Sequence, residues 1–381
     1  MLMIESRQFA REHGLFACIQ CGKCTAGCPM AIKTQINPRT MIYRLLVAGN
    51  SFNLEGYEEL WDCTTCNTCY SRCPKQVNPM ETFIALRSAI VEKGRVHPNV
   101  KTALESTFRH GNPLTMPRED RAAWIGDLDI KVAEEPAEYL YFVGCTPSYD
   151  PRVQKVSRAL VQLLQESGLD FKVLGGEESC CGSEVRRLGE AGLFEMMVEE
   201  NQELYKSMGV ERMFTTSPHC FNTFKNDYPQ NGLQVQHYTQ VLASLLPESG
   251  SDATQKLTFS KKFERTVTYH DPCYLGKHNR IFDEPRAVLK SIPGLKLVEM
   301  DRSREKSLCC EGGGGRMWLE GTNPGLRLAQ LRVKEALETG ADVLATACPF
   351  CLLTLEEAVK HLNAEDRIQV LDIAEIAKEA L

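Results

Sequence analysis

The chain has 381 residues and a slightly acidic composition, with a formal net charge of −6 and a pI near 5.9. This length suggests two or three domains, and nothing in the overall charge suggests a nucleic-acid partner, which would require a basic face. The N-terminal residues lack a signal-peptide pattern, and no stretch approaches the roughly 20 apolar residues of a membrane-spanning helix. We therefore expect a cytoplasmic protein that contacts a membrane only through partners and has no nucleic-acid partner.

The 17 cysteines are far more than ordinary usage for a chain of this length. In a chain without an export signal, a disulfide framework is not expected, and thiolates are more often metal ligands. The spacing of the cysteines along the sequence is the observation that tests this interpretation.

The first hundred residues are predicted to be helical between their cysteines. Asn37 and Asn78 each precede a proline, which is the arrangement of an N-cap followed by proline at the first helical position. Helices are accordingly predicted over four segments: 1–16, 38–49, 55–62 and 79–94. We assign residues 1–100 to an α-helical domain and the proline-interrupted residues 101–137 to a linker with some helix.

From residue 138 onward, a pattern of strands, helices and cysteines occurs twice. In the first copy, strands are predicted over 139–143, 171–174 and 212–216, with helices over 153–167 and 190–208. In the second copy, strands are predicted over 266–269, 296–298 and 342–346, with helices over 284–291 and 324–338. This alternation indicates two α/β units with at least partly parallel sheets, at residues 138–247 and 265–381 with a linker at 248–264. The whole chain is thus predicted to be a multidomain α+β protein.

Two four-cysteine runs of identical spacing lie in the helical domain. Each reads Cys-x2-Cys-x2-Cys-x3-Cys-Pro, the spacing of two-cluster bacterial ferredoxins, in which the fourth cysteine of each run completes the other 4Fe–4S cluster. The predicted ligands are Cys18, Cys21, Cys24 and Cys73 for one cluster and Cys28, Cys63, Cys66 and Cys69 for the other. A pair of zinc sites is the alternative, but such sites usually show separated Cys-x2-Cys pairs.

The duplicated units contain all the other cysteines. The second copy offers five: Cys273, Cys309, Cys310, Cys348 and Cys351. The first copy offers four, Cys145, Cys180, Cys181 and Cys220, and has Ser217 where the second copy has Cys348. The cysteines follow the carboxyl ends of predicted strands, where open α/β sheets place their sites. Because five thiolates exceed the four corners of a cube, the second set indicates a cluster of another kind.

The whole cysteine pattern resembles that of a known family. The helical connection between the ferredoxin runs is similar to the α-helical ferredoxins of respiratory and heterodisulfide reductase subunits, and the duplicated pattern resembles the cysteine-rich CCG domains of heterodisulfide reductase. Residues 15–360 resemble the fused form, in which the ferredoxin-type subunit precedes the catalytic-type subunit. Similar architectures occur in iron–sulfur subunits of glycolate oxidase, anaerobic glycerol-3-phosphate dehydrogenase and electron-transfer-flavoprotein:quinone oxidoreductases, and in the heterodisulfide-reductase-like parts of bifurcating complexes.

The resemblance implies a non-cubane 4Fe–4S cluster bound by Cys273, Cys309, Cys310, Cys348 and Cys351. The sequence departs from the family pattern at Glu311, which replaces glycine after the second cysteine pair and is expected to add negative charge to the site. The following glycines, 312–315, are expected to let backbone approach a cluster and offer N–H donors, with a plain flexible loop as the alternative. For Cys145, Cys180, Cys181 and Cys220, a further cluster, a zinc ion or no metal remain open.

Four ionisable residues lie close to the cysteines and are candidates for delivering protons or tuning a cluster potential: His219, His270, Asp271 and Arg316. Structural hydrogen bonding is the alternative for each. The sequence contains no Rossmann fingerprint, so no bound flavin or NAD is expected.

Two functions follow from these patterns. The first is an electron-transfer subunit of an anaerobic oxidoreductase complex, linking two 4Fe–4S cubes to the non-cubane cluster. Its partners would be redox subunits such as a flavin-bearing heterodisulfide reductase-like subunit, an electron-transfer flavoprotein or a flavin oxidase. The alternative is a catalytic heterodisulfide or thiol reductase subunit that acts on a disulfide at the non-cubane cluster. A zinc-stabilised scaffold is the third interpretation.

Overall fold

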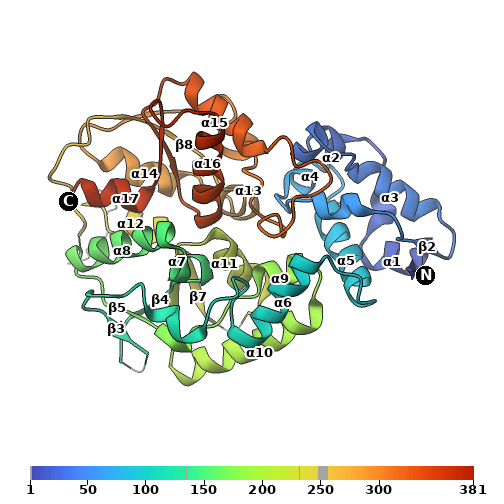
Figure 1. The fold of residues 1–381 in the computed structure, drawn as a ribbon, viewed down its shortest axis with the longest axis horizontal. Coiled ribbons are helices and arrows are strands. Elements are labelled where there is room, and N and C mark those ends of the chain that lie inside the picture. The colour runs from blue at the N-terminus through green and yellow to red at the C-terminus, as the bar shows by residue number, and fades with distance from the viewer. Residues whose placement is uncertain (1, 134, 231, 248–255) are drawn as a thin grey trace.

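A computed structural model describes residues 2–133, 135–230, 232–247 and 256–381 (Figure 1). Residues 248–255 of the predicted linker at 248–264 lie outside the described residues. None of the helices in the described ranges is both long and apolar enough to cross a bilayer.

Three helices form the framework of the N-terminal domain: α1 (Ser6–Glu12), α3 (Pro38–Val47) and α5 (Pro79–Val91). The predicted caps of the second and third are present, since the side chains of Asn37 and Asn78 accept hydrogen bonds from the amides of Thr40 and Glu81. Short helices follow the two cysteine loops, α2 (Lys23–Ala26) and α4 (Thr68–Ser71). The first cysteine loop thus lies between α1 and α3 in the chain, and the second lies between α3 and α5.

Two predicted helices of this domain differ in the structure. The segment 1–16 contains a short strand, β1 (Met3–Ile4), before α1, and that strand pairs antiparallel with β2 (Phe52–Asn53). The segment 55–62 contains only a 3₁₀ turn, over Glu58–Asp62. Both differences reflect tertiary contacts that override local helical preference.

The segment 101–137 is more than a connection. Its first part belongs to helix α6 (Pro98–His110), and its last part forms the strand β3 (Lys131–Val132). Strand β3 pairs in parallel with β5 (Phe171–Val173) and so becomes an edge of the first large sheet. The predicted linker therefore contributes to the neighbouring α/β unit.

The first α/β unit is built on a five-stranded parallel sheet in the order β3-β5-β4-β6-β7. Its further strands are β4 (Tyr139–Phe142), β6 (Arg212–Thr215) and β7 (Gln234–His237). Its longer helices are α8 (Pro151–Glu166), α10 (Ala191–Ser207) and α12 (Tyr238–Ser244). Shorter helices begin at or beside cysteines: α7 (Cys145–Tyr149), α9 (Ser183–Arg187) and α11 (Pro218–Asn222).

The second unit repeats this topology with a four-stranded parallel sheet in the order β11-β10-β8-β9. The strands are β8 (Thr266–Tyr269), β9 (Lys296–Val298), β10 (Val343–Thr346) and β11 (Gln369–Asp372). The helices are α13 (Cys273–Asn279), α14 (Asp283–Ser291), α15 (Leu328–Glu338), α16 (Pro349–His361) and α17 (Ile373–Glu379). Of the four edge strands of these sheets, the sequence predicted β9 but not β3, β7 or β11.

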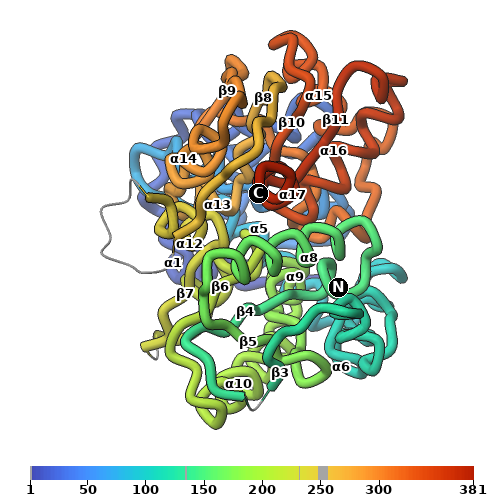
Figure 2. The backbone as a smooth tube through the Cα atoms, turned by 90° about the vertical axis from the view of Figure 1, so that its left-hand side faces the viewer, coloured from blue at the N-terminus to red at the C-terminus, as the bar shows by residue number. Residues whose placement is uncertain are grey.

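The two units pack through equivalent helices in a pseudo-two-fold manner. Helix α8 of the first unit packs on α17 of the second, and α14 of the second packs on α12 of the first. These helices lie between the two sheets in Figure 2. Where they meet, the hydroxyl of Tyr238 donates a 2.6 Å hydrogen bond to Asp372. One hydrophobic core runs through both units as a result.

The N-terminal domain lies against both units at one end of the molecule (Figure 1). The fully buried guanidinium of Arg87 on α5 joins the three parts. It donates to the backbone carbonyls of Leu60 and Cys63 in its own domain, of Arg187 in the first unit and of Gly314 in the second. A buried cation held by carbonyls of three domains fixes their relative positions.

Candidate functional site

The cysteines of the N-terminal domain line two separate cavities. The first cavity contains Cys18, Cys21, Cys24 and Cys73 in its wall. The second contains Cys28, Cys63, Cys66 and Cys69. Each cavity therefore takes three sulfurs from one run and one from the other, which is the grouping that the ferredoxin spacing predicts.

The two cysteine loops owe their shape to residues in the left-handed region. Gln20 and Gly22 have positive φ in the first loop, and Thr65 and Asn67 have positive φ at the equivalent positions of the second. Such alternation curves the backbone into a concave nest that favours anions. The two loops therefore share one fold, which suits the anionic thiolate-bound cluster that each is predicted to bind.

The sulfurs of the second cavity are poorly suited to remain free thiolates. Burial raises the pKa of Cys28 to about 12 and that of Cys63 to about 11. Without a metal these thiols would keep their protons, whereas a bound metal would displace the protons and bind the thiolates. The donor set and its burial thus fit a metal cluster.

The five cysteines of the second α/β unit come together at the carboxyl end of its sheet, and all are buried. Cys273 begins α13 after β8, the pair Cys309 and Cys310 follows β9, and Cys348 and Cys351 lie at the start of α16 after β10. The sulfurs of Cys310 and Cys351 are 3.2 Å apart. The structure thus brings together all five residues predicted for the non-cubane cluster.

Several of these thiols favour the ionised form. Hydrogen bonds from Cys309 and Cys351 lower the pKa of Cys310 well below its ordinary value. Burial opposes ionisation of Cys348, but hydrogen bonds from Cys351 and His219 outweigh it and lower its pKa to about 5. Thiolates are the form in which cysteine binds metals.

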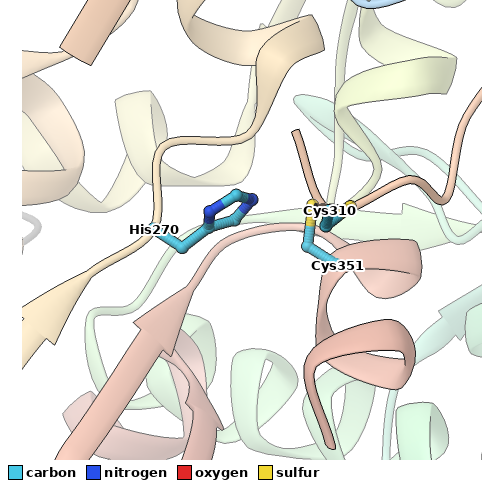
Figure 3. A group of neighbouring side chains, drawn as sticks. All are labelled: His270, Cys310 and Cys351. Carbon is cyan, nitrogen blue, oxygen red and sulfur yellow. Dashed lines mark hydrogen bonds between the residues drawn. The ribbon is translucent and has the colours of Figure 1, made fainter. Parts of the chain in front are cut away.

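His270 faces the same sulfurs from the loop after β8 (Figure 3). A nitrogen of its ring and the sulfurs of Cys310 and Cys351 all lie within 4.8 Å of one another. Its Nδ1 accepts a 3.1 Å hydrogen bond from Arg332, while its buried Nε2 has no partner among the described residues. Burial lowers the pKa of His270 to about 3, so the neutral ring carries its proton on Nε2. An unpartnered N–H beside two sulfurs fits a cluster whose sulfurs accept hydrogen bonds.

Glu311 does not add net negative charge to this site as the sequence suggested. Its side chain is fully buried and lies 3.0 Å from the ammonium of Lys33 and 2.6 Å from the guanidinium of Arg316. Its second oxygen accepts a 2.8 Å hydrogen bond from the amide of Leu328. The carboxylate is neutralised, and because Lys33 belongs to the N-terminal domain, the ion pair joins two domains.

The glycine run allows close approaches that a Cβ atom would prevent. A Cβ atom on Gly314 would lie 2.5 Å from the carbonyl oxygen of Cys63, and one on Gly313 would lie 3.0 Å from that of Thr64. These glycines therefore allow the loop to approach the N-terminal domain. A Cβ atom on Gly312 would lie 3.5 Å from the sulfur of Cys310.

The second ferredoxin-type cavity adjoins the five-cysteine set directly. Cys66, in the wall of that cavity, packs in one cluster with Cys309, close enough for the two thiols to shift each other's pKa, and the sulfur of Cys309 lies 3.5 Å from the hydroxyl of Thr64. Beside this contact, the hydroxyls of Thr65 and Tyr274 are 2.6 Å apart. The two sites are therefore separated by one side-chain contact.

The first α/β unit also gathers its four cysteines, although differently. The sulfurs of Cys181 and Cys220 are 3.2 Å apart, and Cys145 is hydrogen-bonded to Cys180. The guanidinium of Arg121 donates to Cys145 at 3.6 Å. Ser217, at the position of the missing fifth cysteine, accepts a hydrogen bond from the amide of Cys220 and caps α11.

His219 of the first unit reaches into the site of the second. One ring nitrogen contacts Glu184 at 3.1 Å, and the ring is hydrogen-bonded to Cys348. It also packs edge-on against Phe350, which holds the equivalent position in the second copy, with ring centroids 4.8 Å apart. Burial opposes protonation of His219, but the bonds to Cys348 and Glu184 outweigh it and raise its pKa to about 9.

Asp271 and Arg316 serve structural hydrogen bonding. Asp271 forms a two-pronged ion pair with Arg286 at 2.7 and 3.0 Å, and Arg316 pairs with Glu311. Sequence reasoning missed Lys33, Arg87 and Arg121, because isolated basic residues carry no signal of the distant groups that they contact.

Two family models match the chain. The 4Fe–4S dicluster domain matches residues 14–77, and the cysteine-rich domain CCG matches residues 139–225 and 267–356. Among solved structures, the chain is similar to a hypothetical protein from Helicobacter pylori, with a TM-score of 0.53 and 11% identity over 99% of this chain and 71% of that one. That likeness concerns the fold alone.

Three curated proteins are similar over nearly the whole chain. One subunit of the dihydromethanophenazine:CoB–CoM heterodisulfide reductase of Methanosarcina barkeri is 35% identical, over 96% of this chain and 94% of that protein. The "Probable iron-sulfur-binding oxidoreductase FadF" of Bacillus subtilis is 33% identical over 99% of this chain. EtfAB:quinone oxidoreductase of Syntrophomonas wolfei is 32% identical over 96% of it. The chain spans only 61% and 58% of the length of the last two.

Proposed function

The chain belongs to the heterodisulfide reductase-like family of iron–sulfur oxidoreductase proteins, which carry a ferredoxin-type domain and two CCG domains, and we propose that it is the electron-transfer subunit of a larger redox complex. The contact between Cys66 and Cys309 carries the proposal. It joins the second ferredoxin-type cavity to the five-cysteine set without an intervening residue, so that the three sites form a series.

The two cavities of the ferredoxin domain fit 4Fe–4S clusters, and the five-cysteine set fits a non-cubane cluster. Each cavity offers four thiols, and the third site offers five buried thiols with the N–H of His270 aimed at two of them. Bound there, the clusters would supply one-electron transfer. Some four-thiol sites bind zinc, but the paired cavities with exchanged fourth cysteines favour iron–sulfur clusters.

The residues around these sites hold the series rigid and exclude water. Arg87 ties the loop of Cys63 to both α/β units. The buried ion pair of Lys33 and Glu311 joins the ferredoxin domain to the second CCG domain. Electron transfer between sites requires fixed short distances and little reorganisation. A domain interface held by buried, fully bonded charges meets that requirement.

The partners proposed for this chain are redox proteins. Similar proteins are named as a heterodisulfide reductase subunit and as an EtfAB:quinone oxidoreductase, so a flavoprotein is the proposed electron donor or acceptor.

A catalytic heterodisulfide or thiol reductase is the second candidate. The observation in its favour is a cavity between the two units, lined by Cys145, Cys181 and Ser217 on one side and by Trp318 and Phe350 on the other. Ser217 leaves the first cysteine set one sulfur short of the second, which weakens the case for a pair of equivalent cluster sites facing a disulfide.

Metal analysis of protein purified without oxygen tests the proposal, together with EPR of reduced samples. We expect about 12 iron per chain, or about 16 if the first CCG set also binds a cluster. About 8 iron without a third signal would refute the cluster at Cys273, Cys309, Cys310, Cys348 and Cys351. Oxidation of reduced viologen by a heterodisulfide, catalysed by this chain alone, would favour the second candidate.

A further inference from the structure

The ferredoxin domain has a charge distribution opposite to that of the chain as a whole. The chain carries a net charge of −6, yet the two segments 13–54 and 63–80 contain no aspartate or glutamate. They contain six basic residues: Lys23, Lys33, Arg39, Arg44, Arg72 and Lys75. Lys33 is buried with Glu311, and the other five are exposed. The surface formed by these segments is therefore basic.

The same surface carries most of the exposed large apolar side chains of the described residues. Six of the eight belong to the ferredoxin domain, and only Phe108 and Met116 lie elsewhere. Ile19, Tyr43 and Val47 are 59%, 53% and 59% exposed. Exposed apolar groups gathered in one region, with charges around them, are typical of an interaction site.

Part of this surface borders the first ferredoxin-type cavity. Ile19, Arg39 and Lys75 line it, and Tyr43 and Val47 follow Arg39 at four-residue intervals on α3, so that the three share one face of the helix. Helix α3 lies at the end of the molecule away from both sheets (Figure 1). Cys21, in the wall of this cavity, is exposed, whereas the other 16 cysteines are buried or half-buried.

The basic side chains of this face lack acidic partners among the described residues. Arg39, Arg72 and Lys75 form no ion pair within the described parts of the chain. By contrast, many arginines of the two CCG domains are paired, as Arg152 is with Glu356 and Glu375. Unpaired cations around an apolar centre leave charge available for another molecule.

We propose that this face, formed by Ile19, Cys21, Arg39, Tyr43, Arg72 and Lys75, is the docking surface for an acidic redox protein that exchanges electrons at the first cavity. The inference rests on the proposed function and adds where the partner binds and what surface it presents. The partner would carry carboxylates around an apolar patch, with its own redox group near the centre of that patch. Charge complementarity of this kind steers encounter, and the small apolar centre makes the final contact.

A protein fits this face better than a membrane. The exposed Ile19 lines the same cavity as Cys21, an exposed cysteine of a predicted cluster site, which needs a redox partner within close reach. The inner face of α3 is occupied, because Met41, Ile42 and Leu45 are buried in the domain core, so the helix has no broad free apolar face to insert into lipid.

The test uses the complete, cluster-loaded chain and a fully reduced flavodoxin, an acidic FMN protein that donates one electron at a time, as the probe. The second-order rate of cluster reduction is followed by stopped-flow absorbance in increasing salt. The test variant carries Arg39→Glu and Lys75→Glu. The matched control carries Lys206→Glu and Lys261→Glu, which reverse two exposed lysines of the first CCG domain and of the segment before β8. Photoreduction by a small deazaflavin, which needs no docking, measures competence of the clusters in every sample.

For the parent, we expect the rate to fall about tenfold or more between about 0.01 M and about 1 M salt, as the screening length shrinks from about 30 Å to about 3 Å. In low salt, the test variant should react about tenfold more slowly than the parent, and the control variant should match the parent. If the test variant loses iron, the pair Arg39→Gln and Lys75→Gln takes its place.

Three outcomes would overturn the inference. Flavodoxin rates that are independent of salt and equal in all variants, with normal photoreduction, would refute the docking surface alone. Loss of vesicle binding in the test variant, measured with phosphatidylglycerol vesicles, together with unchanged flavodoxin rates would assign the face to a membrane. A parent protein that takes up no electrons by photoreduction would refute the proposed function, and this inference with it.

Discussion

The buried ion pair between Lys33 and Glu311 offers a quantitative test of how the ferredoxin domain is held. Both side chains are fully buried, and their charged atoms are 3.0 Å apart. At an effective dielectric constant of about 20, this separation corresponds to an attraction of about 5 kcal/mol. Removing one member of such a pair leaves a buried charge and typically costs about 3–5 kcal/mol. We therefore expect Glu311→Gln to weaken the local structure by about 3–5 kcal/mol.

Hydrogen exchange is the appropriate assay, because a single unfolding free energy is poorly defined for a multidomain protein with bound clusters. The amide of Leu328 donates to Glu311, so its exchange rate reports opening of this contact. Lys33→Met should cost less than Glu311→Gln, since Arg316 still neutralises the carboxylate. The loss of stability in the double variant should be smaller than the sum of the losses in the two single variants, and the difference should be about 1–3 kcal/mol.

The control is the exposed pair of Lys101 and Glu105, whose side chains are 69% and 52% exposed and 3.8 Å apart. Glu105→Gln should change exchange by less than about 0.5 kcal/mol, as is usual for surface pairs. The reasoning is refuted if Glu311→Gln has an effect as small as this control, or if the effects of Glu311→Gln and Lys33→Met are simply additive.

Three further predictions concern other parts of the molecule. Burial raises the pKa of Asp372 to about 7, above its unfolded value of about 3.9, so stability should fall as pH rises through this window. Asp372→Asn should remove about 2–3 kcal/mol of that decline between about pH 5 and 8, measured by hydrogen exchange at each pH after correction for the intrinsic pH dependence of exchange. If the parent binds three clusters, Ser217→Cys should supply the missing fifth sulfur and raise the iron content by about four atoms per chain. The control Thr216→Cys should leave the iron content unchanged. Equal iron in the parent and both variants would contradict this prediction. Cys73→Ser should remove the EPR signal that Cys24→Ser removes, and Cys28→Ser the signal that Cys69→Ser removes; the opposite pairing would refute the assignment of the two cavities.

The sequence predicted those features that depend on short spacings. The caps at Asn37 and Asn78 are local, and the structure contains both. The inner strands of both sheets were also predicted, because a buried strand such as β4 is apolar throughout. Three edge strands, β3, β7 and β11, were missed, whereas the edge strand β9 was predicted. Strand β7, for example, reads Gln-Val-Gln-His and is partly exposed. An edge strand with one apolar residue gives no signal that distinguishes it from a loop.

The arrangement of the domains could not be predicted in this way. Lys33 and Glu311 are 278 positions apart, and no pattern in a single sequence links them. The glycines at 312–315 were predicted to let backbone approach a cluster because they follow a cysteine pair. Their close approach to the backbone of Cys63 and Thr64 in another domain was not predicted. Both cases involve contacts between domains, for which local spacing contains no information.

The two CCG domains are related by a pseudo-two-fold arrangement, but their surroundings differ, and the difference explains how the sites are organised. The second domain faces the ferredoxin domain, so Cys309 meets Cys66 there. The first domain meets the residues of its own preceding segment instead, where Arg121 contacts Cys145. The first domain has His219 at the position equivalent to Phe350, and this histidine bonds across the pseudo-axis to Cys348. Glu184 accepts hydrogen bonds from both His219 and the amide of Gly315. The first domain therefore completes the environment of the five-cysteine site, a role that does not depend on which metal its own four cysteines bind.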